Sequence, residues 1–108
     1  MDKTISTQEF LAAQQAGPVT VVDVREAQEY VEGHVPGAIF APMSRIHQFL
    51  AQIPRDQALY VICRSGNRSA SITRMMSEGG GFTHVVDAGG GIRAWLGAGQ
   101  PVAPCPSC

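Results

Sequence analysis

The chain has 108 residues, of which 44 % are hydrophobic, and this length suits one domain with one core. Eight basic residues nearly balance nine acidic residues, so the formal net charge is −1. A chain of this charge lacks the basic field that nucleic-acid binding usually requires, and we expect no nucleic-acid partner. No apolar run approaches the length of a membrane span, so we also expect no membrane contact. Size alone favours a monomer.

The three cysteines are Cys63, Cys105 and Cys108. The N-terminal stretch, MDKTISTQEF, lacks the apolar core of a secretory signal peptide. An odd number of cysteines without such a signal is typical of a reducing compartment rather than of a disulfide scaffold. These features predict a cytoplasmic protein.

Helix and strand patterns alternate along the first half of the chain. Ser6 and Glu9 have the spacing of a capping box, which predicts a helix that begins there and stops at Gly17. The other predicted elements are a strand at 19–24, a short helix at 26–33, a short strand at 39–42 and a helix at 43–53.

The second half continues the alternation with a strand at 58–63, a helix at 69–80, a strand at 84–88 and a helix at 92–99. The clearest strands are apolar along their length rather than alternating, which indicates a parallel sheet covered by helices on both faces. In such sheets ligands bind beyond the carboxyl ends of the strands. Residues 1–100 are therefore predicted to form a single α/β domain, and the proline-rich residues 101–108 an extended tail.

The sequence CRSGNRS, residues 63–69, follows the predicted strand at 58–63 and leads into a helix. Gly66 and Asn67 tolerate the positive φ that a tight arc often requires. Such an arc turns successive backbone N–H groups toward its centre and forms an anion nest together with the helix N-terminus. Cys63 would stand at the base of that nest.

A thiol in this position should lose its proton easily. The converging amides, the helix end and the two arginines, Arg64 and Arg68, all favour the thiolate. The loop contains no acid, tyrosine or histidine, so the sequence predicts activation by the local field rather than by a base. The thiolate is the nucleophilic form of cysteine.

Loops of this design serve two chemistries. Phosphatases hold a phosphate in a Cys-x5-Arg loop, whereas the spacing from Cys63 to Arg68 is Cys-x4-Arg, one residue shorter. The smaller cradle suits a terminal sulfur atom better than a phosphate. Two plain alternatives remain at this point: an inert, buried cysteine at a strand end, and arginines that are simply solvated.

Five sequence pieces carry a resemblance to a known family: VVDVRE at 21–26, EYVEGHVPGAI at 29–39, VICRSGNRS at 61–69, GF at 81–82 and GGIRAW at 90–95. In this order over one domain, they make the chain similar to single-domain rhodaneses, the thiosulfate sulfurtransferases and persulfide-transfer modules. The resemblance implies an α/β sandwich with a five-stranded, mainly parallel sheet. Ala88 and Gly89 depart from the family pattern, and extra glycines at 79 and 89 are expected to loosen two connections.

The resemblance also implies a function. Cys63 would be the catalytic nucleophile that accepts a sulfane sulfur from a small anionic donor and passes it to cyanide, a thiol or a protein. The implied substrate-binding residues are Arg64, Ser65, Gly66, Asn67, Arg68 and Ser69. No metal or organic cofactor is implied. The alternatives are a persulfide carrier for a dedicated protein partner and, because of the loop length less favoured, a phosphatase or arsenate reductase.

The remaining family pieces are interpreted as scaffold. We expect Asp23 and Arg25 to form a structural ion pair or to hydrogen-bond to neighbouring loops, His34 to hydrogen-bond to the backbone and Trp95 to cover the sheet.

Cys105 and Cys108 end the chain as a Cys-x-x-Cys pair, which the family pattern lacks. Three interpretations are open: a disordered, reducible tail, a sulfur relay or redox pair acting on Cys63, and half of a zinc site.

Overall fold

The sheet positions everything else in the molecule. In a computed structural model, which describes residues 2–104, five strands pair in the order β1-β5-β4-β2-β3, and every recorded pairing is parallel. The strands are β1 (Asp2–Ile5), β2 (Thr20–Asp23), β3 (Ile39–Phe40), β4 (Leu59–Ile62) and β5 (Val85–Ala88). The predicted α/β class and five-stranded sheet are confirmed, and β4 is the central strand.

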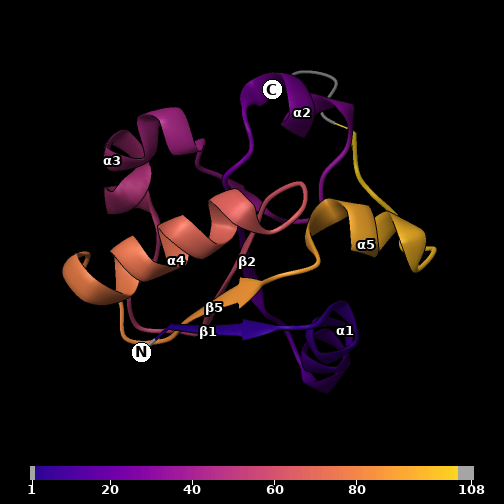
Figure 1. The fold of residues 1–108 in the computed structure, drawn as a ribbon, viewed down its shortest axis with the longest axis horizontal. Coiled ribbons are helices and arrows are strands. Elements are labelled where there is room, and N and C mark those ends of the chain that lie inside the picture. Colours follow the sequence, from indigo (N-terminus) through magenta and orange to yellow (C-terminus); the bar gives the residue numbers. More distant parts are fainter. Residues whose placement is uncertain (1, 105–108) are drawn as a thin grey trace.

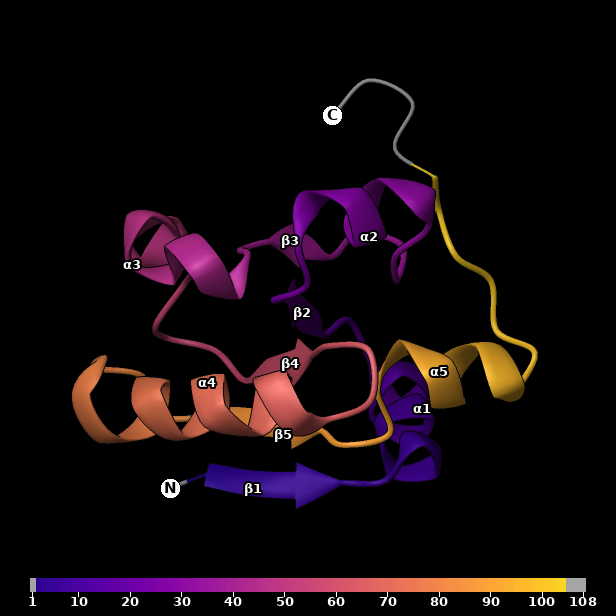
Figure 2. The same ribbon diagram turned by 45° about the horizontal axis from the view of Figure 1, so that its top comes forward.

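Helices cover both faces of this sheet (Figure 1; Figure 2). They are α1 (Thr7–Ala16), α2 (Ala27–Glu32), α3 (Ile46–Phe49), α4 (Asn67–Gly79) and α5 (Gly91–Gly97), with 3₁₀ turns η1 (Met43–Arg45) and η2 (Leu50–Gln52) beside α3. One core cluster joins the sheet to α3 and α4 through Ile46, Ile72 and Met76. A second cluster joins the other face to α1 and α5 through Phe10 and Trp95.

Two predictions about elements were wrong. Strand β1 was not predicted, because its four residues, DKTI, have no strand-like apolar pattern and extend only through pairing with β5. The predicted helix at 43–53 is divided into η1, α3 and η2, since the backbone leaves the helical region at Arg45 (φ −134°, ψ 29°). Ile46 and Ile53 are nevertheless buried, as the helical spacing indicated.

Several local predictions are confirmed. Ser6 and Glu9 form the expected capping box at the start of α1. Arg25 and Asp23 form a buried ion pair with 2.9 Å between Nη2 and Oδ2. The Nδ1 atom of His34 lies 3.0 Å from the carbonyl oxygen of Tyr30, and the 4 % exposed Trp95 covers the sheet.

The chain beyond α5 turns back onto the domain. The indole N–H of Trp95 donates to the carbonyl oxygen of Pro101, and Ala103 pairs with His34 in an isolated antiparallel bridge. The predicted boundary at residue 100 therefore lies before a segment that contacts the domain. Cys105 and Cys108 lie outside the described residues. Within residues 2–104, the helices are all too short or too polar to cross a bilayer.

Candidate active site

Cys63 lies at the carboxyl end of the central strand, between β2 and β5. The residue is 1 % exposed and packs in the core cluster beneath α4. The sequence-predicted loop connects it to Asn67, where α4 begins. The nucleophile predicted from the sequence therefore occupies the edge of the sheet where parallel α/β folds bind ligands.

The loop after Cys63 is held by the start of α5. The backbone N–H of Ile92 donates to the carbonyl oxygen of Cys63 over 2.8 Å, and that of Arg93 donates to the carbonyl oxygen of Arg64 over 3.1 Å. In a trans peptide the C=O and the following N–H point in opposite directions. Because the two carbonyls face α5, the N–H groups that follow them turn toward the inside of the loop.

Gly66 allows the loop to close. Its φ of 108° lies in the left-handed region, and its N–H donates to the sulfur of Cys63 over 3.0 Å. A Cβ at this position would clash with the carbonyl oxygen of Gly89, and a Cβ at Gly91 would clash with that of Arg64. Gly89 is itself enclosed, because a Cβ there would lie 2.6 Å from Thr4 Cγ2. It makes close packing possible, contrary to the expected loosening.

The loop lowers the pKa of the Cys63 thiol. Burial alone would raise it, but hydrogen bonding between the sulfur and the Ser69 side chain and from the backbone of Ser69, Gly66 and Ser65 outweighs burial. The net effect is a pKa below the ordinary value for cysteine. The anion nest predicted from the sequence is therefore present in the geometry, and it favours the nucleophilic form.

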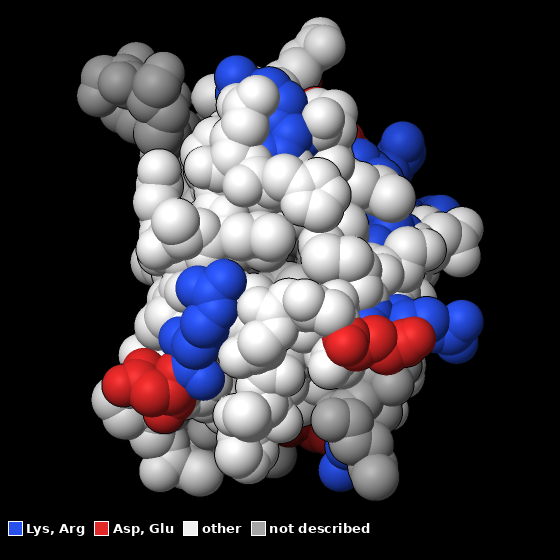
Figure 3. Space-filling model, turned by 90° about the vertical axis from the view of Figure 1, so that its left-hand side faces the viewer, with Lys and Arg blue, Asp and Glu red and all other residues white. Residues whose placement is uncertain are grey.

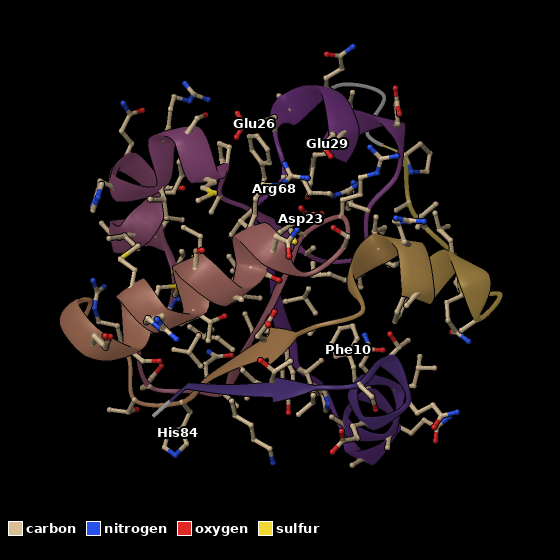
Figure 4. The ribbon with its side chains drawn as sticks, viewed as in Figure 1. Phe10, Asp23, Glu26, Glu29, Arg68 and His84 are labelled. Atoms are coloured by element: carbon tan, nitrogen blue, oxygen red, sulfur yellow. The ribbon has the colours of Figure 1, made fainter. Side chains whose placement is uncertain are left out.

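The two loop arginines differ in their surroundings. Arg68 forms a bidentate pair with Glu29 of α2, with 2.8 Å from Nη1 to Oε1 and 2.9 Å from Nη2 to Oε2 (Figure 4). Hydrogen bonding to Arg68 lowers the pKa of Glu29 to about 2. Arg64 is exposed, and its side chain makes no hydrogen bond or ion pair with another described residue. It lines a cleft with Arg93 and Leu96.

The other predicted loop residues divide between surface and interior. Ser65 and Asn67 are exposed, whereas Ser69 is completely buried in the first turn of α4. Ser69 Oγ lies 3.4 Å from the sulfur of Cys63 and donates to Asp87 Oδ1 over 2.6 Å. Asp87, the residue before Ala88 in β5, was missed as a site residue from the sequence. Its one signal was a carboxylate inside an otherwise apolar strand.

The described residues contain no group of three or more His, Cys, Asp and Glu side chains arranged to hold a metal ion. On the face seen in Figure 3, acidic side chains lie directly beside basic ones, with uncharged surface around them, so charge of one sign does not gather into a single field.

Comparison with known proteins identifies the family. A model of the rhodanese-like domain matches residues 6–98. The chain belongs to this family. The resemblance found from the sequence motifs is therefore confirmed for fold and family. A rhodanese-related protein from Thermoplasma volcanium has a solved structure that aligns with a TM-score of 0.83 and 34 % identity, covering 94 % of this chain and 97 % of that one.

Relatives of this rhodanese-like domain carry two kinds of name. One is a sulfurtransferase of Allochromatium vinosum, 36 % identical over 78 % of both chains. Another, YrkF of Bacillus subtilis, is named as a candidate sulfur carrier protein and is 33 % identical over 73 % of this chain. The chain spans 42 % of YrkF and 45 % of a second longer curated relative, so such proteins contain substantial further sequence.

Proposed function

We propose that this rhodanese-like domain is a sulfurtransferase that moves a sulfane sulfur from thiosulfate or a persulfide donor to a thiophilic acceptor through a persulfide on Cys63. The observation that carries the proposal is the N–H of Gly66, which donates to the sulfur of Cys63 over 3.0 Å inside a loop closed by glycines. That donor favours thiolate before the reaction and persulfide after it. Relatives named for sulfur transfer support the same chemistry.

The reaction is a double displacement. The Cys63 thiolate attacks the outer sulfur of thiosulfate, the sulfur–sulfur bond breaks, and sulfite leaves with the electron pair. An acceptor thiolate or cyanide then takes the outer sulfur and releases the Cys63 thiolate. Because Cys63 is 1 % exposed, the donor sulfur must enter the loop, which favours a slender donor over a phosphate ester. The exposed Arg64 and Arg93 are suited to attract an anionic donor toward the cleft beside the loop.

Intact-protein mass spectrometry after incubation with thiosulfate tests the proposal. We expect the mass of one sulfur atom to be added to the wild type and not to the Cys63→Ser variant, and thiocyanate to form when cyanide follows. No added sulfur from thiosulfate or from low-molecular-weight persulfides would overturn the assignment. Turnover of an aryl phosphate without sulfur transfer would favour the phosphatase alternative instead.

A second candidate is a persulfide carrier for a dedicated protein. The Arg68–Glu29 ion pair favours it, because Arg68 is already occupied. Of the two loop arginines, this leaves Arg64 to bind a free anionic donor. Relatedness to YrkF supports it as well. A carrier would take up stoichiometric sulfur on Cys63 yet release it slowly to cyanide, whereas an enzyme that uses small acceptors would turn over many times.

A further inference from the structure

Arg68 ends the active-site loop, and its guanidinium is already occupied by a carboxylate. Nη1 donates to Oε1 of Glu29 over 2.8 Å, and Nη2 donates to Oε2 over 2.9 Å. Arginine binds phosphate and similar oxyanions with the same pair of parallel N–H groups. While Glu29 accepts both of these hydrogen bonds, the two N–H groups cannot bind the oxygens of an incoming sulfur donor.

Glu29 is held in this position by more than its ion pair. It is the third residue of α2, and its Oε1 also accepts the backbone N–H of Glu26 over 3.1 Å in a capping box. Helix α2 is fixed in turn by Tyr30, whose hydroxyl donates to the carbonyl oxygen of Ala38 over 2.8 Å. Figure 4 shows Glu29 and Arg68 between α2 and the start of α4. Three N–H groups therefore converge on one carboxylate whose helix is anchored.

Both members of the pair stay charged whenever Cys63 is a thiolate. Hydrogen bonding to Arg68 lowers the pKa of Glu29 to about 2. Hydrogen bonding to Glu29 raises the pKa of Arg68, and the charge of the Cys63 thiolate raises it further. Arg68 is thus close enough to Cys63 for their charges to interact, and Glu29 cancels the positive charge that Arg68 would otherwise offer to an anion there.

The cleft beside the loop contains charges of both signs. Besides Glu29, its charged lining residues are Arg25, Glu32, Arg64 and Arg93. Asp23 neutralises Arg25 in a buried ion pair, so an anion in the cleft meets two carboxylates as well as two exposed arginines. Coulomb energy is proportional to charge, so neutralising Arg68 costs a dianion about twice what it costs a monoanion.

We propose that Glu29 is a specificity-determining residue: it occupies the guanidinium of Arg68 and makes the site select singly charged sulfur donors over thiosulfate, which carries two negative charges. The donor class that fits is a persulfide, whose sulfur pair carries at most one charge. The Cys63 thiolate attacks the outer sulfur, the sulfur–sulfur bond breaks, and the inner sulfur leaves as a thiolate with the electron pair. Any proton on the outer sulfur stays with it. This selection rests on the proposed sulfur transfer.

The test compares two donors that deliver the same outer sulfur, thiosulfate and the monoanion methanethiosulfonate. The measured quantity is the ratio of their second-order rate constants for persulfide formation on Cys63. Serine replaces Cys105 and Cys108 throughout, so that Cys63 is the one cysteine present. Glu29→Gln removes the charge but keeps a residue suited to the capping box. We expect it to raise the ratio of thiosulfate to methanethiosulfonate by about threefold or more.

Glu32→Gln is the matched control, because it removes the same charge from the same cleft. Glu32 is exposed, and the ion pairs among the described residues do not include it, so the ratio should rise less. Adding Arg68→Gln to Glu29→Gln should return the ratio toward that of the wild type, because the released guanidinium is then gone. A rise no larger than that of Glu32→Gln, or one that persists without Arg68, would overturn the proposal.

Alkylation measures the same selection without a sulfur donor. Iodoacetate is an anion and iodoacetamide is neutral, but both react with the Cys63 thiolate, so the ratio of their rates cancels any change in the thiol pKa. Glu29→Gln should raise the ratio of iodoacetate to iodoacetamide, and Glu32→Gln should raise it less. An unchanged ratio in Glu29→Gln would refute the role of Glu29. Failure of both sulfur donors in every variant would instead refute sulfur transfer, so the two failures are distinguishable.

Discussion

Replacing Gly66 by alanine tests whether the loop backbone sets the reactivity of Cys63. The Gly66 N–H donates to the sulfur over 3.0 Å, at a φ of 108° that alanine adopts only under strain. The added Cβ would also clash with the carbonyl oxygen of Gly89, which is backbone and cannot swing aside. The loop must therefore move, and the hydrogen bond to the sulfur must lengthen or break.

The size of the effect follows from this hydrogen bond. A hydrogen bond to a charged group contributes about 1.5–3 kcal/mol. Losing this donor should therefore raise the pKa of the Cys63 thiol, and because about 1.4 kcal/mol is tenfold in an equilibrium constant, alkylation at a fixed pH below that pKa should slow by about tenfold or more. The left-handed backbone conformation adds a destabilisation of the fold of about 1–2 kcal/mol, and the clash increases it further.

The assay is iodoacetamide alkylation of Cys63 across pH, together with urea unfolding. Gly37→Ala is the matched control, because Gly37 also has a positive φ, of 83°, but an added Cβ would meet nothing within 4 Å. That variant should lose about 1 kcal/mol of stability without a change in the thiol pKa. If Gly66→Ala leaves the alkylation profile unchanged while it unfolds at lower urea, the backbone N–H does not stabilise the thiolate, and the reasoning is refuted.

Three further predictions concern the scaffold. Asp23→Asn should cost about 3–5 kcal/mol in urea unfolding, because it leaves Arg25, itself 5 % exposed, without its counter-charge; a cost below 1 kcal/mol would contradict this. Glu29→Gln should cost about 1 kcal/mol at neutral pH, because solvent screens the pair with Arg68. Since the pKa of Glu29 is lowered to about 2, its contribution is present above the ordinary value of 4.5 and fades as the pH falls toward 2, so wild type and variant should converge there. Phe10→Ala should lower the free energy of unfolding by about 3–5 kcal/mol, because the 1 % exposed ring packs against Tyr60 and Trp95. Thermal unfolding measures this loss, and the activity per folded molecule should stay unchanged.

The fold was predictable where local pattern and burial agree. The predicted segments 19–24 and 58–63 are mostly apolar because helices cover both faces of the sheet, and they contain β2 and β4. Strand β1 gives no such signal, since it lies at the edge of the sheet and, of its residues 3–5, Ile5 alone is buried. Its strand conformation comes from the ladder with β5, which a sequence pattern does not contain.

The division of residues 43–53 has a different cause. Ile46, in α3, and Ile53, at the end of η2, are both buried, so the apolar residues at helical spacing reach the core although the helix is divided. The pattern therefore predicted the buried side chains correctly and the helix type incorrectly. The break between η1 and α3 lies at Arg45, whose backbone angles are not helical and whose side chain makes no capping hydrogen bond. The sequence therefore contains no capping residue from which the break could be predicted.

The part of the candidate site that is contiguous in the sequence was predicted, and the part that a different strand contributes was missed. The loop from Cys63 to Ser69 is continuous in the sequence, so its thiol, glycine and helix start could be interpreted together. The absence of an acid within the loop led to the expectation of activation by field alone. Asp87 lies 18 residues after Ser69, yet the parallel pairing of β5 with β4 places it opposite Val61, two residues before Cys63.

A carboxylate inside a strand that is buried on both faces must find a donor, because it cannot reach water. In this fold the donor nearest to Asp87 is the serine that also faces the nucleophile, at 2.6 Å and 3.4 Å respectively. The same argument applies to Asp23, which ends the other neighbour of β4 and is satisfied by Arg25. The two acids flank the central strand but have different partners. Asp87, which has no cation among the described ion pairs, is held by the serine whose hydroxyl also faces Cys63.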